Sequence, residues 1–168
     1  MLSSGGAAPE GVWRMAQPAD DESVVEMCLG LFDEDPGPLP VAGTNMRATL
    51  AHLRRDPGRG RAVVLDVEQQ VSGYALLIPF WSNELGGEIC EVDELFVAPE
   101  HRNRGYGSSL FAAIAQGDLW PLPVAAIVLG VTPNNLAARR LYERLGFAAA
   151  GVAMVRRLPR GADDGGDR

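Results

Sequence analysis

Lysine is missing from this chain of 168 residues, so all 15 of its basic residues are arginines. They are outnumbered by 22 acidic residues, which gives a formal net charge of −7. A protein that binds nucleic acid needs a basic face, so this composition argues against a nucleic-acid partner. An acidic surface favours cationic small molecules instead, although acidity also serves solubility alone.

Cysteine and histidine are also scarce. Cys28 and Cys90 lie in apolar surroundings without metal-ligand spacing, so buried free thiols are expected in place of a disulfide framework. The two histidines, His52 and His101, are too few for a zinc site or a recognisable catalytic triad. We therefore expect no metal centre.

Long hydrophobic runs are absent as well. No apolar stretch approaches the length of a membrane-spanning helix, and the first residues, MLSSGGAAPEG, lack the apolar centre of a signal peptide. We expect no membrane association and a cytoplasmic location. The polar, glycine-rich stretches 1–10 and 159–168 are expected to be disordered. The remainder, residues 11–158, is predicted to form one domain.

Helix-like and strand-like patterns alternate within that domain. Apolar spacing predicts helices over residues 18–32, 44–55, 106–115 and 133–145. Strands are predicted over residues 12–15, 62–68, 71–79, 89–97 and 124–131, with one or two more in 147–157. Thr44 is the predicted N-cap of the second helix, and residues 80–88 have the composition of a turn-rich loop. The order predicts an α/β fold around a mixed sheet.

The most distinctive stretch is a basic glycine loop, RNRGYGS (102–108), between a predicted strand and a predicted helix. Glycines let several backbone N–H groups point one way, and a helix start adds partial positive charge, which suits a phosphate or pyrophosphate. A plain strand-to-helix turn would use the same glycines. A dinucleotide fingerprint needs a third glycine where Leu110 stands, and a Walker loop needs a lysine. Both nucleotide motifs are therefore excluded.

The loop resembles the pyrophosphate signature of the GCN5-related N-acetyltransferases (GNAT), Gln/Arg-x-x-Gly-x-Gly/Ala, as Arg102-x-x-Gly105-x-Gly107. The preceding LFVAPE (95–100) is similar to that family's fourth strand and turn. A second family element follows in the expected order, as Asn135-x-x-Ala138-x-x-Leu141-Tyr142-x-x-x-Gly146-Phe147. The resemblance implies the GNAT fold: a mixed, mostly antiparallel sheet of six to seven strands, splayed into a V between the fourth and fifth and flanked by about four helices.

The resemblance also implies an activity, the transfer of an acetyl group from acetyl-CoA to a primary amine in a ternary complex. In the family the loop N–H groups hold the pyrophosphate, the fourth strand pairs with the pantetheine arm, and an N–H near Phe96 polarises the thioester carbonyl. The matching cofactor-binding positions are Leu95, Phe96, Val97, Arg102, Asn103, Arg104, Gly105, Tyr106, Gly107, Ser108, Asn135 and Tyr142. A CoA-binding sensor without turnover is the alternative function. By analogy with the family, a homodimer is an expected assembly.

Four residues are candidates for proton transfer. Tyr142 matches a family tyrosine that protonates the departing thiolate, and a core tyrosine is its structural alternative. Glu91, Asp93 and Glu94 are candidate bases: histone-type members place the base at Glu91, and polyamine-type members carry an acidic pair at Asp93 and Glu94. Strand alternation puts Glu91 and Asp93 on one face and Glu94 on the other unless a bulge intervenes. Pairing with arginines and a water-mediated base remain alternatives.

In this fold the substrate is recognised mainly by the loop after the first helix and by the turn between the third and fourth strands. The first carries Asp33, Glu34 and Asp35, and the second carries Trp81 and Glu84. Carboxylates beside aromatic faces suit an alkylammonium, whereas a solvated acidic loop and a packed tryptophan would explain the same residues. We expect a small polyamine-like or amino-sugar amine, with a protein or peptide amine as the alternative.

Overall fold

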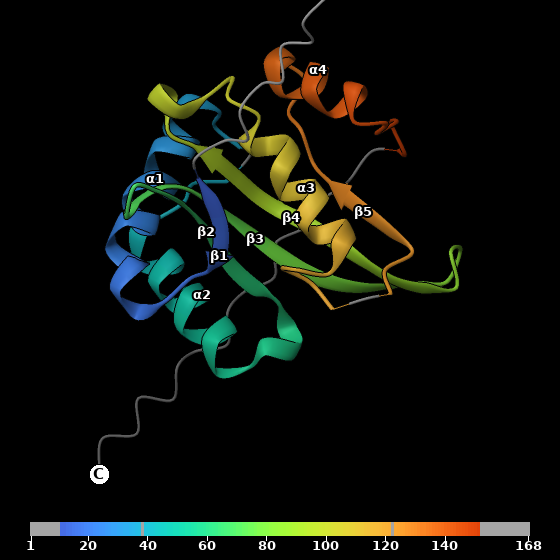
Figure 1. The fold of residues 1–168 in the computed structure, drawn as a ribbon, viewed down its shortest axis with the longest axis horizontal. Coiled ribbons are helices and arrows are strands. Elements are labelled where there is room, and N and C mark those ends of the chain that lie inside the picture. Colours follow the sequence, from blue (N-terminus) through green and yellow to red (C-terminus); the bar gives the residue numbers. More distant parts are fainter. Residues whose placement is uncertain (1–10, 38, 122, 152–168) are drawn as a thin grey trace, which may run out of the picture.

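The centre of the computed structural model, which describes residues 11–37, 39–121 and 123–151, is a five-stranded sheet (Figure 1). Its strands lie in the order of the chain: β1 (Val12–Met15), β2 (Arg61–Val67), β3 (Gln70–Ser82), β4 (Gly87–Val97) and β5 (Ala126–Leu129). Neighbouring strands are antiparallel except β4 and β5, which are parallel. A parallel pair needs a crossover connection, and this one contains the glycine loop and a helix.

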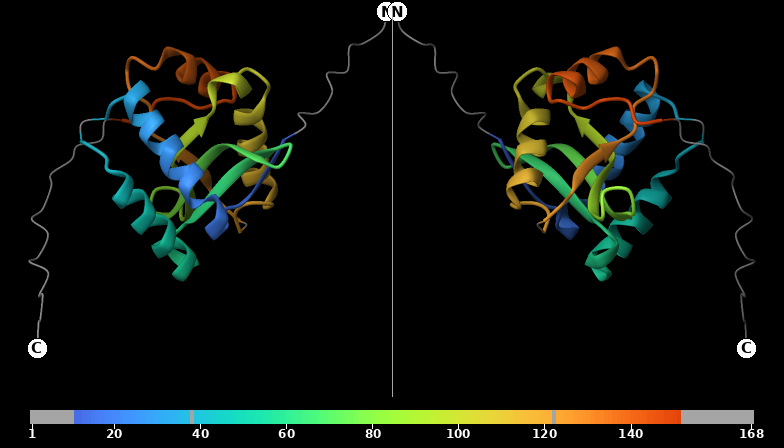
Figure 2. Two further views of the ribbon diagram at one scale, coloured as in Figure 1. Left: turned by 90° about the vertical axis from the view of Figure 1, so that its left-hand side faces the viewer. Right: turned by 90° about the vertical axis from the view of Figure 1, so that its right-hand side faces the viewer.

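Helices cover both faces of the sheet. Figure 2 shows α1 (Asp21–Glu34) and α2 (Gly43–Arg55) on one side and α3 (Tyr106–Gln116) on the other. The helix α4 (Leu136–Arg144) follows β5. Short 3₁₀ helices span Pro18–Asp20, Pro57–Arg59 and Pro99–His101. Within the described residues, no helix has the length and apolar character to cross a membrane.

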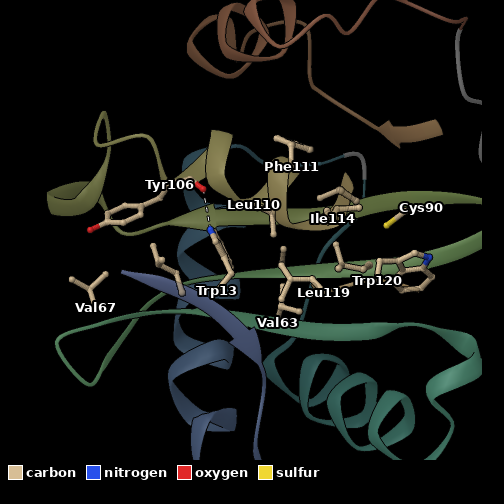
Figure 3. Close-up of a cluster of buried hydrophobic side chains, with 14 residues drawn as sticks. Trp13, Val63, Val67, Cys90, Tyr106, Leu110, Phe111, Ile114, Leu119 and Trp120 are labelled. Atoms are coloured by element: carbon tan, nitrogen blue, oxygen red, sulfur yellow. Dashed lines mark hydrogen bonds between the residues drawn. The ribbon is translucent and has the colours of Figure 1, made fainter. Parts of the chain in front are cut away.

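Each face of the sheet has its own hydrophobic core. The core beneath α3 includes Trp13, Leu110 and Ile114, all buried (Figure 3). The Trp13 indole donates a hydrogen bond of 2.9 Å to the carbonyl of Tyr106, the first residue of α3. The edge strand β1 therefore fixes the helix end into which the glycine loop runs. The opposite core, beneath α1 and α2, is built around the fully buried Tyr74 and Leu50.

The predicted α/β class and GNAT fold are confirmed, with fewer strands than predicted among the described residues. Residues 147–151 form no strand, and the remainder of the predicted final strands, 152–157, lies outside the described residues. The stretches predicted to be disordered, 1–10 and 159–168, also lie outside them, so that expectation stays a prediction.

Several predicted boundaries were wrong. Most of the turn-rich loop predicted over residues 80–88 belongs to a hairpin, because Phe80 pairs with Ile89 and Ser82 with Gly87. The helix α2 begins at Gly43, with Ala42 as its N-cap in place of Thr44, and the carbonyl of Ala42 accepts a hydrogen bond from the Asn45 N–H. The last helix begins at Leu136, three residues later than predicted.

The two parallel strands separate partway along their length. Pairing between β4 and β5 runs only from Ile89–Ala126 to Val92–Leu129, while β4 continues to Val97. This is the predicted V-shaped splay. It begins at a β-bulge, since Leu77 faces Val92 and Leu76 faces Glu94, which leaves Asp93 as the extra residue.

A partly buried ion pair joins β1 to the start of α1. Asp20 is buried and accepts hydrogen bonds from the Arg14 guanidinium (2.8 and 3.1 Å) and from the Gln17 N–H (2.7 Å). We expect Asp20→Asn to lower the free energy of unfolding by about 2 kcal/mol, because it leaves Arg14 half-paired in a partly buried position. The exposed pair Arg47–Glu22 provides the control, and Glu22→Gln should cost less.

The loss of stability in Asp20→Asn should also depend on pH. The Arg14 hydrogen bond holds the pKa of Asp20 below its usual value. The Asp20 contribution is then present above the carboxyl pKa of the unfolded chain and is lost as the pH falls through the folded-state pKa. Urea unfolding of both proteins should show the difference at neutral pH and its disappearance in acid, whereas a constant difference would contradict the role of the charge.

Candidate functional site

A cavity of about 420 Å³ opens at the splayed ends of the strands, between the C-terminal half of β4, the glycine loop and α4. All of the predicted cofactor-binding residues except Arg104 line it. Two carboxylates from the end of α1, Glu34 and Asp35, also line it, together with His101. The structure thus brings both sequence signatures to one cavity.

The glycine loop ends in a row of free backbone donors. Asn103 (φ 60°) and Gly105 (φ 83°) have left-handed backbone conformations, and Gly105 is the N-cap of α3. The first hydrogen bond of the helix runs from the Ser109 N–H to the Gly105 carbonyl. The N–H groups of Tyr106, Gly107 and Ser108 therefore precede any helical acceptor. Residues 106–108 line the cavity, and their N–H groups and the helix dipole would favour an anion there.

The two signature glycines have different reasons to be glycine. A Cβ at Gly105 would meet open space, so the left-handed φ is what favours glycine there. A Cβ at Gly107 would lie 2.8 Å from a methyl carbon of Leu141. Gly107 therefore allows the start of α3 to pack closely against α4, which carries Tyr142.

Arg102, the first residue of the signature, is held on three sides. Its Nε donates to the carbonyl of Val97 (2.8 Å), and its Nη2 contacts both carboxylate oxygens of Glu34 (3.0 and 2.7 Å). The guanidinium also lies 5.3 Å from the centre of the Phe96 ring. Glu34, predicted to contact substrate, lies at the glycine loop, where its ion pair with Arg102 ties the end of α1 to that loop.

The splayed part of β4 leaves backbone groups without a strand partner. The Ala98 N–H donates to Ser72 O (2.8 Å), so residues 94, 96 and 98 direct their backbone groups toward β3 by the alternation of an antiparallel ladder. Leu95 and Val97 then direct theirs into the splay. The N–H near Phe96 that was expected to face a thioester is therefore that of Leu95 or Val97, because the N–H of Phe96 points toward β3.

Tyr142 lies on the cavity wall and belongs to an aromatic cluster. Its ring contacts those of Phe111 (centroids 5.9 Å apart) and Phe147 (5.8 Å) edge-on. Burial raises the pKa of the Tyr142 phenol, and the negative charge of Asp35 raises it further. A phenol in this environment stays protonated at neutral pH and is a proton donor.

Asn135 is the N-cap of α4. Its Oδ1 accepts from the Ala138 N–H (3.2 Å), and its Nδ2 donates to Asp35 (2.9 Å). Asp35 also accepts from the Thr132 hydroxyl at 2.6 Å, so this carboxylate joins the end of α1 to the connection between β5 and α4.

The three candidate bases lie near the bulge, and none of them lines the cavity. The bulge places Glu91 and Glu94 on one face, since their partners Ile78 and Leu76 both face α1 and α2, which corrects the prediction that Glu91 and Asp93 share a face. Glu94 accepts a 2.7 Å hydrogen bond from the Tyr74 hydroxyl. Burial and the charge of Asp93 raise the pKa of Glu94, and burial raises that of the adjacent Asp93.

The remaining substrate candidates lie apart from this cavity. Trp81 is 67% exposed on the β3–β4 hairpin, and Glu84 is exposed at its turn, at the end of β4 opposite the glycine loop. Trp81 instead lines a separate hollow with Leu85 and Glu88. Asp33 is exposed at the end of α1 and does not line the cavity.

Sequence reasoning assigned no place in the cavity to Asp35 or His101. Asp35 was noted only as part of an acidic loop, and its partners lie 97 and 100 positions away. His101 directly precedes Arg102, the first residue of the glycine-loop signature. This position was the sequence feature that could have indicated a place for His101 in the cavity. Its Nδ1 is buried and has no hydrogen-bond partner among the residues that the structure describes. In the same part of the chain, no group of three His, Cys, Asp or Glu side chains is placed to hold a metal ion.

Solved structures with this fold include several acetyltransferases. A possible acetyltransferase from Clostridium difficile 630 superposes with a TM-score of 0.71 at 20% identity, covering 90% of this chain and 99% of that chain. A ribosomal-protein-alanine N-acetyltransferase from Brucella melitensis biovar Abortus 2308 has a TM-score of 0.68 at 18% identity. The match covers 88% of this chain and 99% of that chain. An aminoglycoside N-acetyltransferase in complex with CoA has a TM-score of 0.68 at 16% identity, covering 94% and 99%. At these identities the likeness concerns the fold.

Sequence comparison assigns the family. No curated protein sequence matches the chain significantly. The acetyltransferase (GNAT) family model matches residues 26–147, which include both signatures and the whole of the cavity wall between β4 and α4. Because this match spans more than half of the chain, the protein belongs to the GNAT family of acetyltransferases.

Proposed function

We propose that the protein transfers an acetyl group from acetyl-CoA directly to a small primary amine. One observation carries this proposal: the free N–H groups at the start of α3, the unpaired edge of β4 and the Tyr142 phenol all face one cavity. An anion site, a strand edge and a proton donor are the three features that a phosphorylated thioester with an amide-containing arm requires.

The residues present fit acetyl-CoA. The N–H groups of Tyr106, Gly107 and Ser108 would hold the pyrophosphate, and the backbone of Leu95 with the N–H of Val97 would hold the pantetheine arm. The unpartnered Nδ1 of His101 marks a polar position on the same wall that a ligand could satisfy. When bound, acetyl-CoA supplies an acetyl group activated as a thioester.

The chain's own residues supply the proton transfers. Tyr142 Oη holds the proton that the departing sulfur requires, since its raised pKa keeps it protonated. A covalent acyl-enzyme is not needed. Burial raises the pKa of Cys28 to about 11 and that of Cys90 to about 12, and neither thiol lines the cavity. Direct transfer to the amine is therefore the mechanism that we propose.

Glu94 is our candidate for the base that accepts the amine proton. Its side chain is fixed by Tyr74 at the start of the splay, and burial raises its pKa toward the working range of a base. We expect Glu94→Gln to lower kcat/KM about 100-fold and to remove the acid limb of its pH profile. In the unaltered enzyme, that limb should fall at a pH above the pKa of an ordinary glutamate, because the base must be deprotonated to act.

The pH profiles of kcat/KM for Asp93→Asn and Glu91→Gln complete this test. An acid limb kept in Glu94→Gln but lost in one of these variants would assign the base to that residue. A limb kept in all three would indicate a water-mediated base.

An acceptor screen tests the proposed function as a whole. Release of free CoA from acetyl-CoA would be measured with polyamines, aminoglycosides and peptides bearing an N-terminal alanine. The net charge of −7 supports a cationic acceptor, and relatives of this fold include N-acetyltransferases named for aminoglycosides and for a ribosomal-protein alanine. We expect amine-dependent release with a small polyamine-like or amino-sugar acceptor. Tight CoA binding without amine-dependent release would instead indicate a sensor.

A further inference from the structure

Asp35 is a carboxylate of the cavity that the proposed chemistry does not use. It ends α1, on one face of the sheet, and its two oxygens reach across to the segment that follows β5. One oxygen accepts from the Thr132 hydroxyl (2.6 Å) and the other from Asn135 Nδ2 (2.9 Å). The contact therefore links the end of α1 to the connection between β5 and α4.

The contact with Asn135 controls how that residue caps α4. An asparagine amide can turn over, exchanging its oxygen and nitrogen. With Nδ2 held by a carboxylate, Oδ1 must point the other way, and it accepts from the Ala138 N–H. The orientation of the first turn of α4 is thus set from outside the helix, and Tyr142 lies further along the same helix.

We propose that Asp35 is a positioning residue, which orients the Asn135 cap and thereby holds α4 and the Tyr142 phenol against the cavity. This inference rests on the proposed function only for its kinetic consequence. Its structural part concerns α4 and Tyr142 whether or not the protein turns over acetyl-CoA.

The charge of Asp35 adds a second effect on the same phenol. The other ionisable side chains that line the cavity with Tyr142 are Glu34, His101, Arg102, Tyr106 and Arg144. Glu34 and Arg102 neutralise each other through their ion pair. Asp35 has hydroxyl and amide partners but no cationic one among its hydrogen bonds, so its negative charge acts on Tyr142 and raises the pKa of the phenol.

Two variants separate the effect of Asp35 on the orientation of α4 from the effect of its negative charge. Asp35→Ala removes both hydrogen bonds, so the Ala138 amide should exchange with solvent faster and kcat should fall about 10- to 100-fold through misplacement of Tyr142. Asp35→Asn removes the charge but keeps a side chain that can bond to both partners. It should keep kcat near neutral pH within about threefold of the unaltered enzyme.

The pH dependence is the decisive readout. In Asp35→Asn the Tyr142 pKa should fall, so the alkaline limb of kcat should move to lower pH, a shift that a purely structural role would not produce. Glu143→Gln removes a charge from an exposed neighbour of Tyr142 on the same helix and should leave the limb in place.

The Tyr142 titration can also be followed without turnover, by NMR of isotope-labelled tyrosine, with the resonance assigned through Tyr142→Phe. A lower Tyr142 pKa in Asp35→Asn together with faster Ala138 exchange in Asp35→Ala supports the proposal. An unchanged Tyr142 pKa in Asp35→Asn, or unchanged Ala138 exchange in Asp35→Ala, overturns it. Absence of acetyl transfer by the unaltered protein would refute the proposed function but leave both measurements valid.

Discussion

Ser108→Glu is expected to weaken the binding of acetyl-CoA about 30-fold while leaving the protein folded. Ser108 is the third residue of α3 and lines the cavity, and its N–H precedes the first helical hydrogen bond. A glutamate at this position suits the helix, because acidic side chains stabilise helix N-termini. The same carboxylate would repel a pyrophosphate by about 2 kcal/mol, which corresponds to a loss of affinity of about 30-fold. Isothermal titration with CoA measures the effect.

Ser108→Gln is the matched control, since it has nearly the same size and no charge. It should lose much less affinity than Ser108→Glu, and the gap between the two should narrow as salt is added. Equal affinities for the two variants would contradict the placement of the pyrophosphate at the start of α3. This pair is a cleaner test than a substitution of Gly107, where any side chain would also press on Leu141.

The glycine loop was predictable because its signal is local. The left-handed Gly105 and the N–H groups after it follow from a strand, a glycine turn and a helix in immediate succession. The place of Tyr142 on the cavity wall was instead implied by the resemblance of the second signature to the GNAT family. Spacing within one short helix does not say which other element that helix faces.

The arrangement of the carboxylates could not be predicted in the same way. Whether Asp93 continues the alternation of β4 depends on the register with β3, in which Leu76 faces Glu94 and Leu77 faces Val92. That register is a property of the pair of strands. The sequence of β4 alone allows either arrangement, and the bulge reverses which carboxylates share a face.

Contacts between distant segments account for the other differences. Asp35 bonds to Thr132 and Asn135 across 97 and 100 positions of sequence, so it has no local pattern. Glu34 also has a distant partner, Arg102, which is 68 positions away. Glu34 and Asp35 are adjacent in an acidic segment whose sequence resembled a solvated or amine-binding loop. Their distant partners place them against different walls of the cavity, Glu34 at the glycine loop and Asp35 at the start of α4.

Tyr142→Phe should lower kcat about 100-fold and leave the affinity for acetyl-CoA nearly unchanged. The phenylalanine ring keeps the edge-on contacts with Phe111 and Phe147, so only the hydroxyl is lost. If that hydroxyl gives its proton to the departing sulfur, its loss affects the chemical step and not binding. Steady-state kinetics with a good amine acceptor, together with CoA titration, separates the two effects. An unchanged kcat would remove Tyr142 from the mechanism and leave it as a core residue.

The direction in which the rate changes with pH gives an independent test of Tyr142 as the acid catalyst. Burial, and then the charge of Asp35, raise the pKa of Tyr142 above that of a free phenol, which is about 10. An acid catalyst acts while protonated, so the rate of the unaltered enzyme should hold through neutral pH and fall only above that value. Tyr142→Phe has no proton to lose and should lack this alkaline limb. A limb that persists in the variant would have to come from another group, and the loss of rate would then reflect the position of α4 and not acid catalysis.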